Sequence, residues 1–248
     1  MADAPSLPVP RGPISEHVLR SLADPPSSSR ARWAASLPST VHPLADDDLH
    51  LALYCLYELH YRGLPGVDPM WEWDPRVLEL RARLEARFEA ALREAVGPVL
   101  PDVDVRAALV AESEGDGPSL SSWMEHQGTV DAMREFCVHR SLYQLKEADP
   151  HTWGIPRLQG RPKAALVAIQ ADEYGGGDEP SMHSTLFADT MAALGLDTRY
   201  GAYLDAVPGE TLATVNLVTM FGLHRRWRGA LVGHLALFEM TSRGPMAR

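Results

Sequence analysis

The sequence predicts an all-α fold, and two features of its apolar pattern lead to this prediction. Apolar residues recur every three or four positions through most of the chain after residue 45, as on the buried face of a helix. The alternation of apolar and polar residues that marks strands is absent, as is the Asn-Gly dipeptide of hairpin turns. We therefore expect a helical bundle that forms one domain over residues 41–248.

Residues 1–40 differ in composition from the rest of the chain. Eight of the 20 prolines lie within the first 43 residues, together with a run of serines. Pro25 and Pro26 exclude a continuous helix at that point, because proline lacks the backbone donor that a helix needs. We expect residues 1–40 to be a mobile lead-in, with a short helix near residues 14–22.

The helical pattern then returns in eight segments. We expect helices at residues 46–61, 74–96, 104–112, 121–146, 162–174, 181–194, 198–207 and 211–241. Asp74 and Pro75 mark one start clearly, because aspartate caps helix N-termini and proline fits the first helical position. The segment 211–241 is the longest and is apolar on most sides, so we expect it to be central in the bundle.

Charge and cysteine content exclude several classes of protein. The chain has 248 residues, and 23 basic against 33 acidic side chains give a net charge of −10. Such a surface repels nucleic acid and anionic lipid. Cys55 and Cys137 alone provide neither a disulfide framework nor a cysteine zinc site. No signal peptide and no uncharged stretch of 18 residues is present, so we expect a cytoplasmic protein that binds no membrane.

Ten histidines suggest metal chemistry, and helical bundles build metal sites from side chains that project into the core. Iron suits mixed carboxylate and imidazole ligands. Glu147 and Glu173 lie near the ends of expected helices, and His183 lies near the start of the next. Acids at helix C-termini oppose the helix dipole, which a bound cation compensates. In the alternative interpretation, all three are solvated residues at helix ends.

Other candidates have simpler structural interpretations. Three groups have a spacing that a metal can use, namely Glu135 with His139, Glu58 with His60, and His42 with Asp46 and His50. Surface hydrogen bonds or helix caps explain each of them. His224 and His234 lie in the apolar last segment, where a histidine is a core residue or lines a substrate pocket. The glycines at residues 175–177 lack the strand and the lysine of a phosphate-binding loop.

Several long stretches resemble a known family. They are residues 139–153 (HRSLYQLKEADPHTW), 169–177 (IQADEYGGG), 182–187 (MHSTLF), 220–226 (MFGLHRR), 233–236 (GHLA) and 238–242 (FEMTS). These stretches are similar to iron-containing redox enzymes, which are haem-oxygenase-like di-iron oxidases. The resemblance covers about residues 45–242 and implies a haem-oxygenase-like helical bundle that binds iron without haem.

The resemblance also implies a ligand set. Glu147 matches the family's first glutamate, and Glu173 and His183 match a glutamate followed by a histidine ten residues later. Some family members have a further carboxylate three residues before that histidine. This position is Pro180 here, which makes the neighbouring Glu179 a candidate for an additional ligand.

The family's last core helix carries a His-x-x-x-Asp-x-x-His motif that supplies ligands to a second iron. Nothing after His183 fits this motif. We therefore expect a bundle that lacks the last core helix and exposes apolar residues of the segment 211–241. Large apolar patches are uncommon on monomers, so we expect a homodimer.

The implied activity is that of a non-haem iron enzyme with one or two iron ions and O₂ as co-substrate. Its substrate would be a small molecule such as an amino acid, an amine or a fatty acid. Arg140, Asp149 and Tyr174 are candidates for supporting the ligands, whereas the sequence identifies no catalytic or substrate-binding residue. One alternative is a cofactor-free enzyme with Cys137 as nucleophile, although this cysteine lies on an apolar helix face. The other is a truncated or degenerate member that acts as a non-catalytic binding or assembly module.

Overall fold

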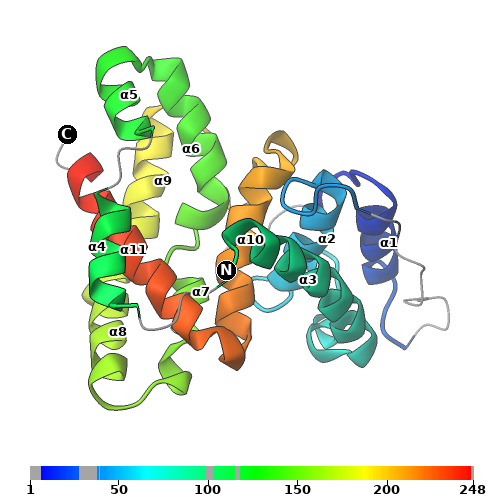
Figure 1. Cartoon of the computed structure of the whole chain (residues 1–248). Helices are drawn as coiled ribbons and strands as arrows, with labels where there is room; N and C mark the ends of the chain where they lie inside the picture. The colour runs from blue at the N-terminus through cyan, green and yellow to red at the C-terminus, as the bar shows by residue number, and fades with distance from the viewer. Residues whose placement is uncertain (1–6, 28–37, 39, 99–102, 115–117, 247–248) are drawn as a thin grey trace. The chain divides into compact units, whose positions relative to one another are not determined.

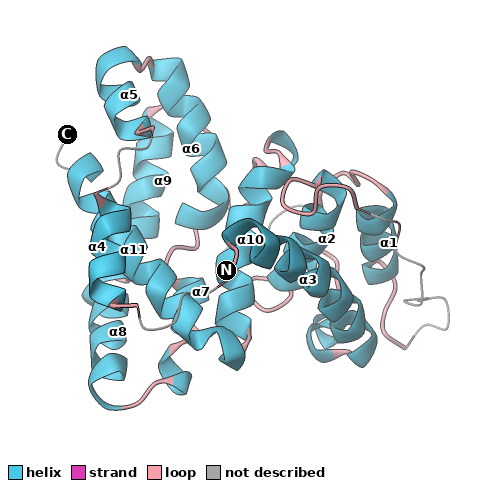
Figure 2. Cartoon of the chain, viewed as in Figure 1, coloured by secondary structure: helices cyan, strands magenta, loops and turns pink. Residues whose placement is uncertain are grey.

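The computed structural model describes residues 7–27, 38, 40–98, 103–114 and 118–246. These residues form helices that are joined by turns (Figure 1), and Figure 2 shows no strand among them. The all-α fold class is therefore confirmed for the described part of the chain. Every helix within these ranges is too short or too polar to cross a lipid bilayer.

The chain divides into two compact units, where the sequence favoured a single domain. Unit 1 comprises Met1–Gly97, Ser141–Lys146 and Asp197–Leu217. Unit 2 comprises Pro98–Arg140, Glu147–Leu196 and Val218–Arg248. Residues 1–6, 28–37 and 39 of the expected lead-in lie outside the described residues, and the boundary at residue 40 stays a prediction.

Unit 1 is built around one buried helix. Its elements are α1 (Pro13–Leu22), α2 (Asp47–Glu58), η1 (Pro69–Trp73), α3 (Pro75–Val96), η5 (Leu204–Ala206) and the first part of α10 (Gly209–Leu223). α2 packs against both α1 and α3, and each of its residues from Leu49 to Glu58 is buried. The short helix expected near residues 14–22 is α1. Its side chains Ile14, Val18 and Leu22 are buried, so this part of the expected lead-in is packed.

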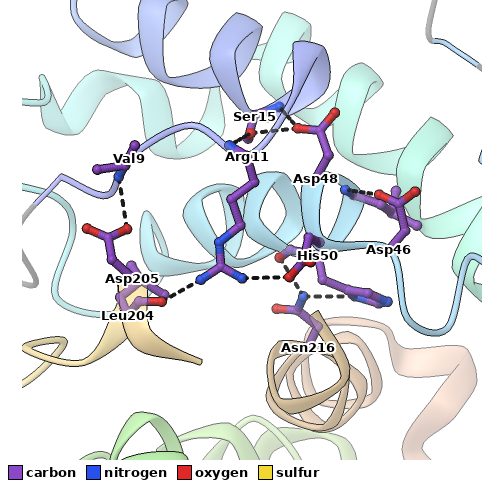
Figure 3. A network of polar contacts seen from close by, with 11 residues as sticks. Val9, Arg11, Ser15, Asp46, Asp48, His50, Leu204, Asp205 and Asn216 are labelled. Atoms are coloured by element: carbon purple, nitrogen blue, oxygen red, sulfur yellow. Dashed lines mark hydrogen bonds and ion pairs between the residues drawn. The ribbon is translucent and has the colours of Figure 1, made fainter. Parts of the chain in front are cut away.

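Polar contacts fix the start of α1 within unit 1 (Figure 3). The Asp48 carboxylate accepts hydrogen bonds from the backbone N–H groups of Ile14 at 2.8 Å and Ser15 at 2.7 Å. The Arg11 guanidinium donates to Asp47 at 3.0 Å and to the Leu204 carbonyl at 2.6 Å. Asp48 therefore takes the place of an N-capping residue, since the backbone donors of a helix's first turn have no partner within the helix.

The same region accounts for the group formed by His42, Asp46 and His50. Asp46 caps α2 by accepting a hydrogen bond from the N–H of Leu49 at 2.7 Å. The buried His50 ring places Nε2 2.8 Å from the Pro43 carbonyl, and Asn216 donates to the His50 carbonyl at 2.9 Å (Figure 3). His42 is exposed. Asp46 and His50 thus have structural partners, as the simpler interpretation of these residues expected.

Unit 2 consists of α-helices that are joined by turns and short 3-10 helices. Its elements are α4 (Val105–Ser113), α5 (Leu120–Gln127), most of α6 (Val130–Gln144), α7 (Asp149–Thr152), η2 (Ile155–Arg157), α8 (Gly160–Glu173), η3 (Gly175–Gly177), η4 (Glu179–Ser181), α9 (His183–Ala193), η6 (Arg225–Trp227) and α11 (Arg228–Met246). α11 packs against α4 and α7, and its contact with α4 is visible in Figure 1.

The long helix expected at residues 121–146 is wrong, because it is two helices with a break. Gly128 has an extended backbone with ψ of 144° and follows the end of α5. Thr129 then caps α6 by accepting a hydrogen bond from the N–H of Ala132 at 3.1 Å. Since α6 ends at Gln144, the helix stops earlier than expected, and Glu147 lies in the following connection rather than directly after the helix.

Two further predicted helices are also wrong. The segment 211–241 divides at His224, whose extended backbone (φ −107°, ψ 115°) separates α10 from η6 and α11. Arg157 donates to the carbonyls of Gly222 and Leu223, the latter at 2.8 Å, and so satisfies groups that a continuous helix would have used. The short helix expected at residues 198–207 is reduced to the single turn of η5.

Candidate metal centre

Three side chains converge in unit 2, namely Glu147, Glu173 and His183. Each offers one ligand atom, and these atoms lie within 4.8 Å of one another. All three residues are partly buried. Within the described ranges, no other group of three or more acidic, histidine or cysteine side chains comes together in this way. The structure thus brings together the three residues that the sequence and the resemblance singled out.

A glycine turn returns the chain from Glu173 to His183. Glu173 is the last residue of α8 and His183 is the first of α9. Between them, Gly175, Gly176 and Gly177 have φ values of 61°, 63° and 91°, a region that favours glycine. A Cβ atom on Gly175 would lie 2.6 Å from the carbonyl carbon of Ser181. The glycines therefore serve the geometry of this centre.

Glu147 lies in the connection between α6 and α7, next to an unusual backbone. Ala148 has a φ of 73° and is the only non-glycine residue with positive φ in the part of the chain described. Its carbonyl accepts hydrogen bonds from the N–H groups of His151 at 3.0 Å and Thr152 at 3.1 Å, at the start of α7. A left-handed alanine costs about 1–2 kcal/mol, so its surroundings must hold this conformation.

Glu173 and His183 pair with each other within the centre. His183 Nδ1 lies 2.8 Å from Glu173 Oε2, within ion-pair range. Burial raises the pKa of the Glu173 carboxyl, and His183 opposes this shift while the nearby Glu239 adds to it. A bound cation would compensate the carboxylate charge that burial disfavours.

The donor set fits iron. Non-haem iron enzymes use imidazole and carboxylate ligands and keep open coordination positions. Ligand atoms at about 2.1 Å from a metal are at most about 4.2 Å apart. The separations of up to 4.8 Å therefore require only a small movement of the side chains to close on one ion.

Glu58 and His60 do not form a metal site, because each has another partner in unit 1. Glu58 is fully buried and forms an ion pair with the buried Lys146. His60 Nδ1 lies 3.3 Å from Glu72 Oε1, and its other ring nitrogen contacts Arg81. The two-residue spacing of Glu58 and His60 therefore reflects two separate structural contacts and no shared ligand.

Tyrosine side chains contact both members of the Lys146–Glu58 ion pair. The Tyr200 hydroxyl donates to Glu58 Oε1 at 2.8 Å. Lys146 Nζ lies 4.3 Å from the centroid of the Tyr61 ring and 5.2 Å from that of Tyr54, which are cation–π distances. The buried charges of unit 1 are therefore paired with one another and surrounded by aromatic rings.

The remaining candidate residues lie outside the cluster of Glu147, Glu173 and His183 in this structure. Glu135 is exposed on α6, and neither it nor His139 is a member. Glu179 is exposed on η4 and is not a member either. Cys137 is buried, and burial raises the pKa of its thiol. A buried thiol of raised pKa is a poor nucleophile, which supports the interpretation of Cys137 as a core residue.

Two buried polar residues of unit 2, Gln170 and His151, were not among the residues predicted from the sequence. Gln170 lies three residues before Glu173 on α8, a spacing that places both on one helix face. His151 on α7 stacks against His234 with ring centroids 5.8 Å apart. Burial, together with His234, lowers the pKa of His151 to about 4. The i, i+3 spacing from Glu173 was the signal available for Gln170, whereas nothing in the sequence indicated the histidine pair.

Residues 134–248 match the model of a protein family described as iron-containing redox enzyme. The match includes Glu147, Glu173 and His183, and it confirms the resemblance over this part of the chain. It indicates an iron-dependent redox function. No curated protein matches the chain.

Proposed function

We propose, from the match of residues 134–248 to iron-containing redox enzymes, that the protein is a non-haem iron oxidoreductase that uses O₂ to oxidise a small molecule. The convergence of Glu147, Glu173 and His183 within 4.8 Å is the observation that carries this proposal. These residues would hold one iron ion. When bound, iron would supply the change of oxidation state that lets O₂ react with an organic molecule.

The protein's own residues account for the binding of the cation. The carboxylates of Glu147 and Glu173 balance the two positive charges of Fe(II), and His183 adds a neutral donor when its imidazole coordinates. Three protein ligands leave coordination positions open for O₂ and substrate.

Two local structures orient these ligands. The glycine turn at residues 175–177 sets the approach of His183 to Glu173, and the left-handed Ala148 sets the backbone next to Glu147. Preorganised ligands bind a metal without a further cost of ordering. The substrate class that we propose is an amino acid, an amine or a fatty acid, and the homodimer stays a prediction.

Iron analysis of the purified protein tests the proposal. We expect about one iron per chain after anaerobic loading with Fe(II), and O₂ uptake that increases when the correct substrate class is added. Glu173→Gln keeps the side-chain size but removes the charge, and it should abolish both results. Glu135→Gln changes an exposed acid outside the cluster and should leave both unaltered.

The alternative function, a non-catalytic helical module, predicts a different result. Wild-type protein would then take up no more iron than Glu173→Gln, and no member of the substrate panel would stimulate O₂ uptake. That outcome would contradict the proposed function.

A further inference from the structure

Glu147 and Glu173 come from separate segments of unit 2, and a chain of hydrogen bonds joins these segments. Gln170 Nε2 donates to the Ala148 carbonyl at 2.8 Å and to Thr152 Oγ1 at 2.6 Å. Gln170 belongs to α8, whereas Ala148 directly follows Glu147. One buried amide therefore links the residue next to the first ligand to the helix that carries the second.

The chain continues through two hydroxyl groups. Thr152 Oγ1 lies 3.0 Å from the Tyr174 hydroxyl, which donates to Asp149 Oδ1 at 2.8 Å. Because Tyr174 uses its only proton for Asp149, its oxygen is an acceptor for Thr152. Tyr174 follows Glu173 directly. The second link thus also joins a residue next to Glu173 to the α7 segment that follows Glu147.

Three observations indicate that these links position the ligands. Gln170 is only 3% exposed, so its hydrogen bond to the Ala148 carbonyl forms away from competing water. The carbonyl to which it donates belongs to Ala148, whose backbone has a positive φ that is unfavourable for alanine and must be held by its contacts. Both links end on residues adjacent to the two carboxylate ligands, although the bonds reach over 22 to 25 residues of sequence.

We propose that Gln170, Thr152 and Tyr174 form a clasp that positions Glu147 against Glu173 for metal binding. We call these three residues the Gln170 clasp. The inference rests on the proposed function, since it assumes that the cluster binds a metal. None of the three residues is a ligand, and each acts on the metal only through the backbone of Glu147 or Glu173.

Supporting residues around metal ligands change affinity by about 10- to 100-fold when they are replaced. We therefore expect Gln170→Leu to weaken metal affinity by about that factor, because the Ala148 carbonyl then loses its donor from α8. Tyr174→Phe removes a single hydroxyl group and should weaken affinity by less. Thr152→Val removes the hydroxyl oxygen that joins the two links, while the Gln170–Ala148 and Tyr174–Asp149 hydrogen bonds remain, and it should weaken affinity. Thr152→Ser keeps that oxygen and should restore wild-type affinity.

The test uses Co(II) as a spectroscopic probe, added to the metal-free full chain. Titration gives the affinity, and the visible absorption of bound Co(II) reports the ligand geometry. We expect weaker binding and an altered spectrum for Gln170→Leu and Thr152→Val, with both restored in Thr152→Ser. A residue with only a structural role would lower the melting temperature without altering the spectrum of the bound ion.

The outcomes separate the two proposals. If wild-type protein binds Co(II) and the Thr152→Val and Thr152→Ser variants bind it alike with the wild-type spectrum, the clasp is overturned while the metal centre stands. If wild-type protein binds no Co(II), the metal centre and the clasp fail together. Should Gln170→Leu not fold, the two variants of the exposed Thr152 still decide the question.

Discussion

Lys146 and Glu147 are neighbours in the sequence, yet the clusters to which they belong handle charge in opposite ways. Lys146 is buried in unit 1, where Glu58 neutralises it and tyrosine rings surround it. Glu147 joins a second carboxylate and an imidazole in unit 2. The first cluster joins one carboxylate to one ammonium group, whereas the second brings two carboxylates to one imidazole.

A structural ion pair and a candidate metal centre can therefore be told apart by the charges that each brings together. Buried charges are tolerated where each meets an opposite charge, and removal of one partner then leaves the other exposed to the low-dielectric interior. Two carboxylates that converge with an imidazole instead form a set of ligands for a cation. The predictions below test each half of this comparison.

The largest effect is expected in unit 1. Glu58→Gln leaves the buried Lys146 without its counter-charge and should lower the free energy of unfolding by about 3–5 kcal/mol. Addition of Lys146→Met to this variant should recover much of the loss, because no unpaired charge remains. Urea denaturation measures both changes.

The matched control for this prediction is Glu16→Gln, which breaks an exposed ion pair with Arg20 on α1. Exposed pairs contribute about 0–1 kcal/mol. If Glu58→Gln destabilises the protein no more than this control does, the Glu58–Lys146 pair is not a structural ion pair, and its contrast with the cluster of Glu147, Glu173 and His183 is wrong.

The next effect concerns His151, a buried titratable group of unit 2 that stacks against another imidazole. Its pKa of about 4 lies below the ordinary value of 6.5, so between these values the unfolded chain binds a proton that the folded chain does not. Stability should therefore fall by up to about 3 kcal/mol as the pH drops from about 6.5 to about 4.

Comparison of wild type with His151→Gln isolates this contribution from that of the carboxylates. The difference in unfolding free energy between the two should change across this pH window and be constant above it. Nuclear magnetic resonance of the His151 ring gives the pKa directly. A midpoint near 6.5 would show that the ring is solvated and would refute the prediction.

The comparison also shows how much of the molecule the sequence could predict. Helical periodicity identified α3 at residues 75–96 closely, because Asp74, Pro75 and Gly97 mark its ends. It failed at Gly128 and His224, where the helix breaks depend on local backbone geometry and on contacts with distant residues. The Arg157 side chain that satisfies the last carbonyls of α10 lies 65 residues away in the sequence, beyond the reach of a local pattern.

The candidate centre was predictable for a different reason. Glu173 and His183 lie ten residues apart, and the glycine run between them signals a tight turn. Glu147 lies 26 residues before Glu173, and the resemblance to the family is what singled it out. The partners of Glu58 were not predictable, since Tyr200 lies 142 residues away and Lys146 lies 88 residues away. The two-residue spacing from His60 gave no indication of this long-range ion pair.

The third prediction concerns the candidate metal centre formed by Glu147, Glu173 and His183. His183→Ala removes one of three ligands and should lower the affinity for Fe(II) by at least about 100-fold, a little under 3 kcal/mol. The His183 side chain is 41% exposed, so the metal-free variant should unfold within about 0.5 kcal/mol of wild type. Anaerobic titration and urea denaturation measure the two quantities.

His126→Ala is the control, because this histidine of unit 2 is exposed and lies outside the cluster. His17 is unsuitable, since its ring nitrogen Nε2 is buried. Equal loss of iron binding in His126→Ala and His183→Ala would mean that the cluster is not where the ion binds.

The smallest effect is expected at Glu179, and it sharpens the definition of the cluster. Glu179 is exposed on η4 and is not among the three converging side chains, although the family pattern made it a candidate ligand. A solvated carboxylate outside the coordination sphere acts on the ion only through a screened charge. Glu179→Gln should therefore change Fe(II) affinity by less than about twofold, whereas a ligand would contribute as much as His183 does. A loss of Fe(II) affinity of tenfold or more in anaerobic titration would show that the connection between α8 and α9 moves to add a fourth ligand. The metal centre would then include Glu179 besides the three side chains that converge in this structure.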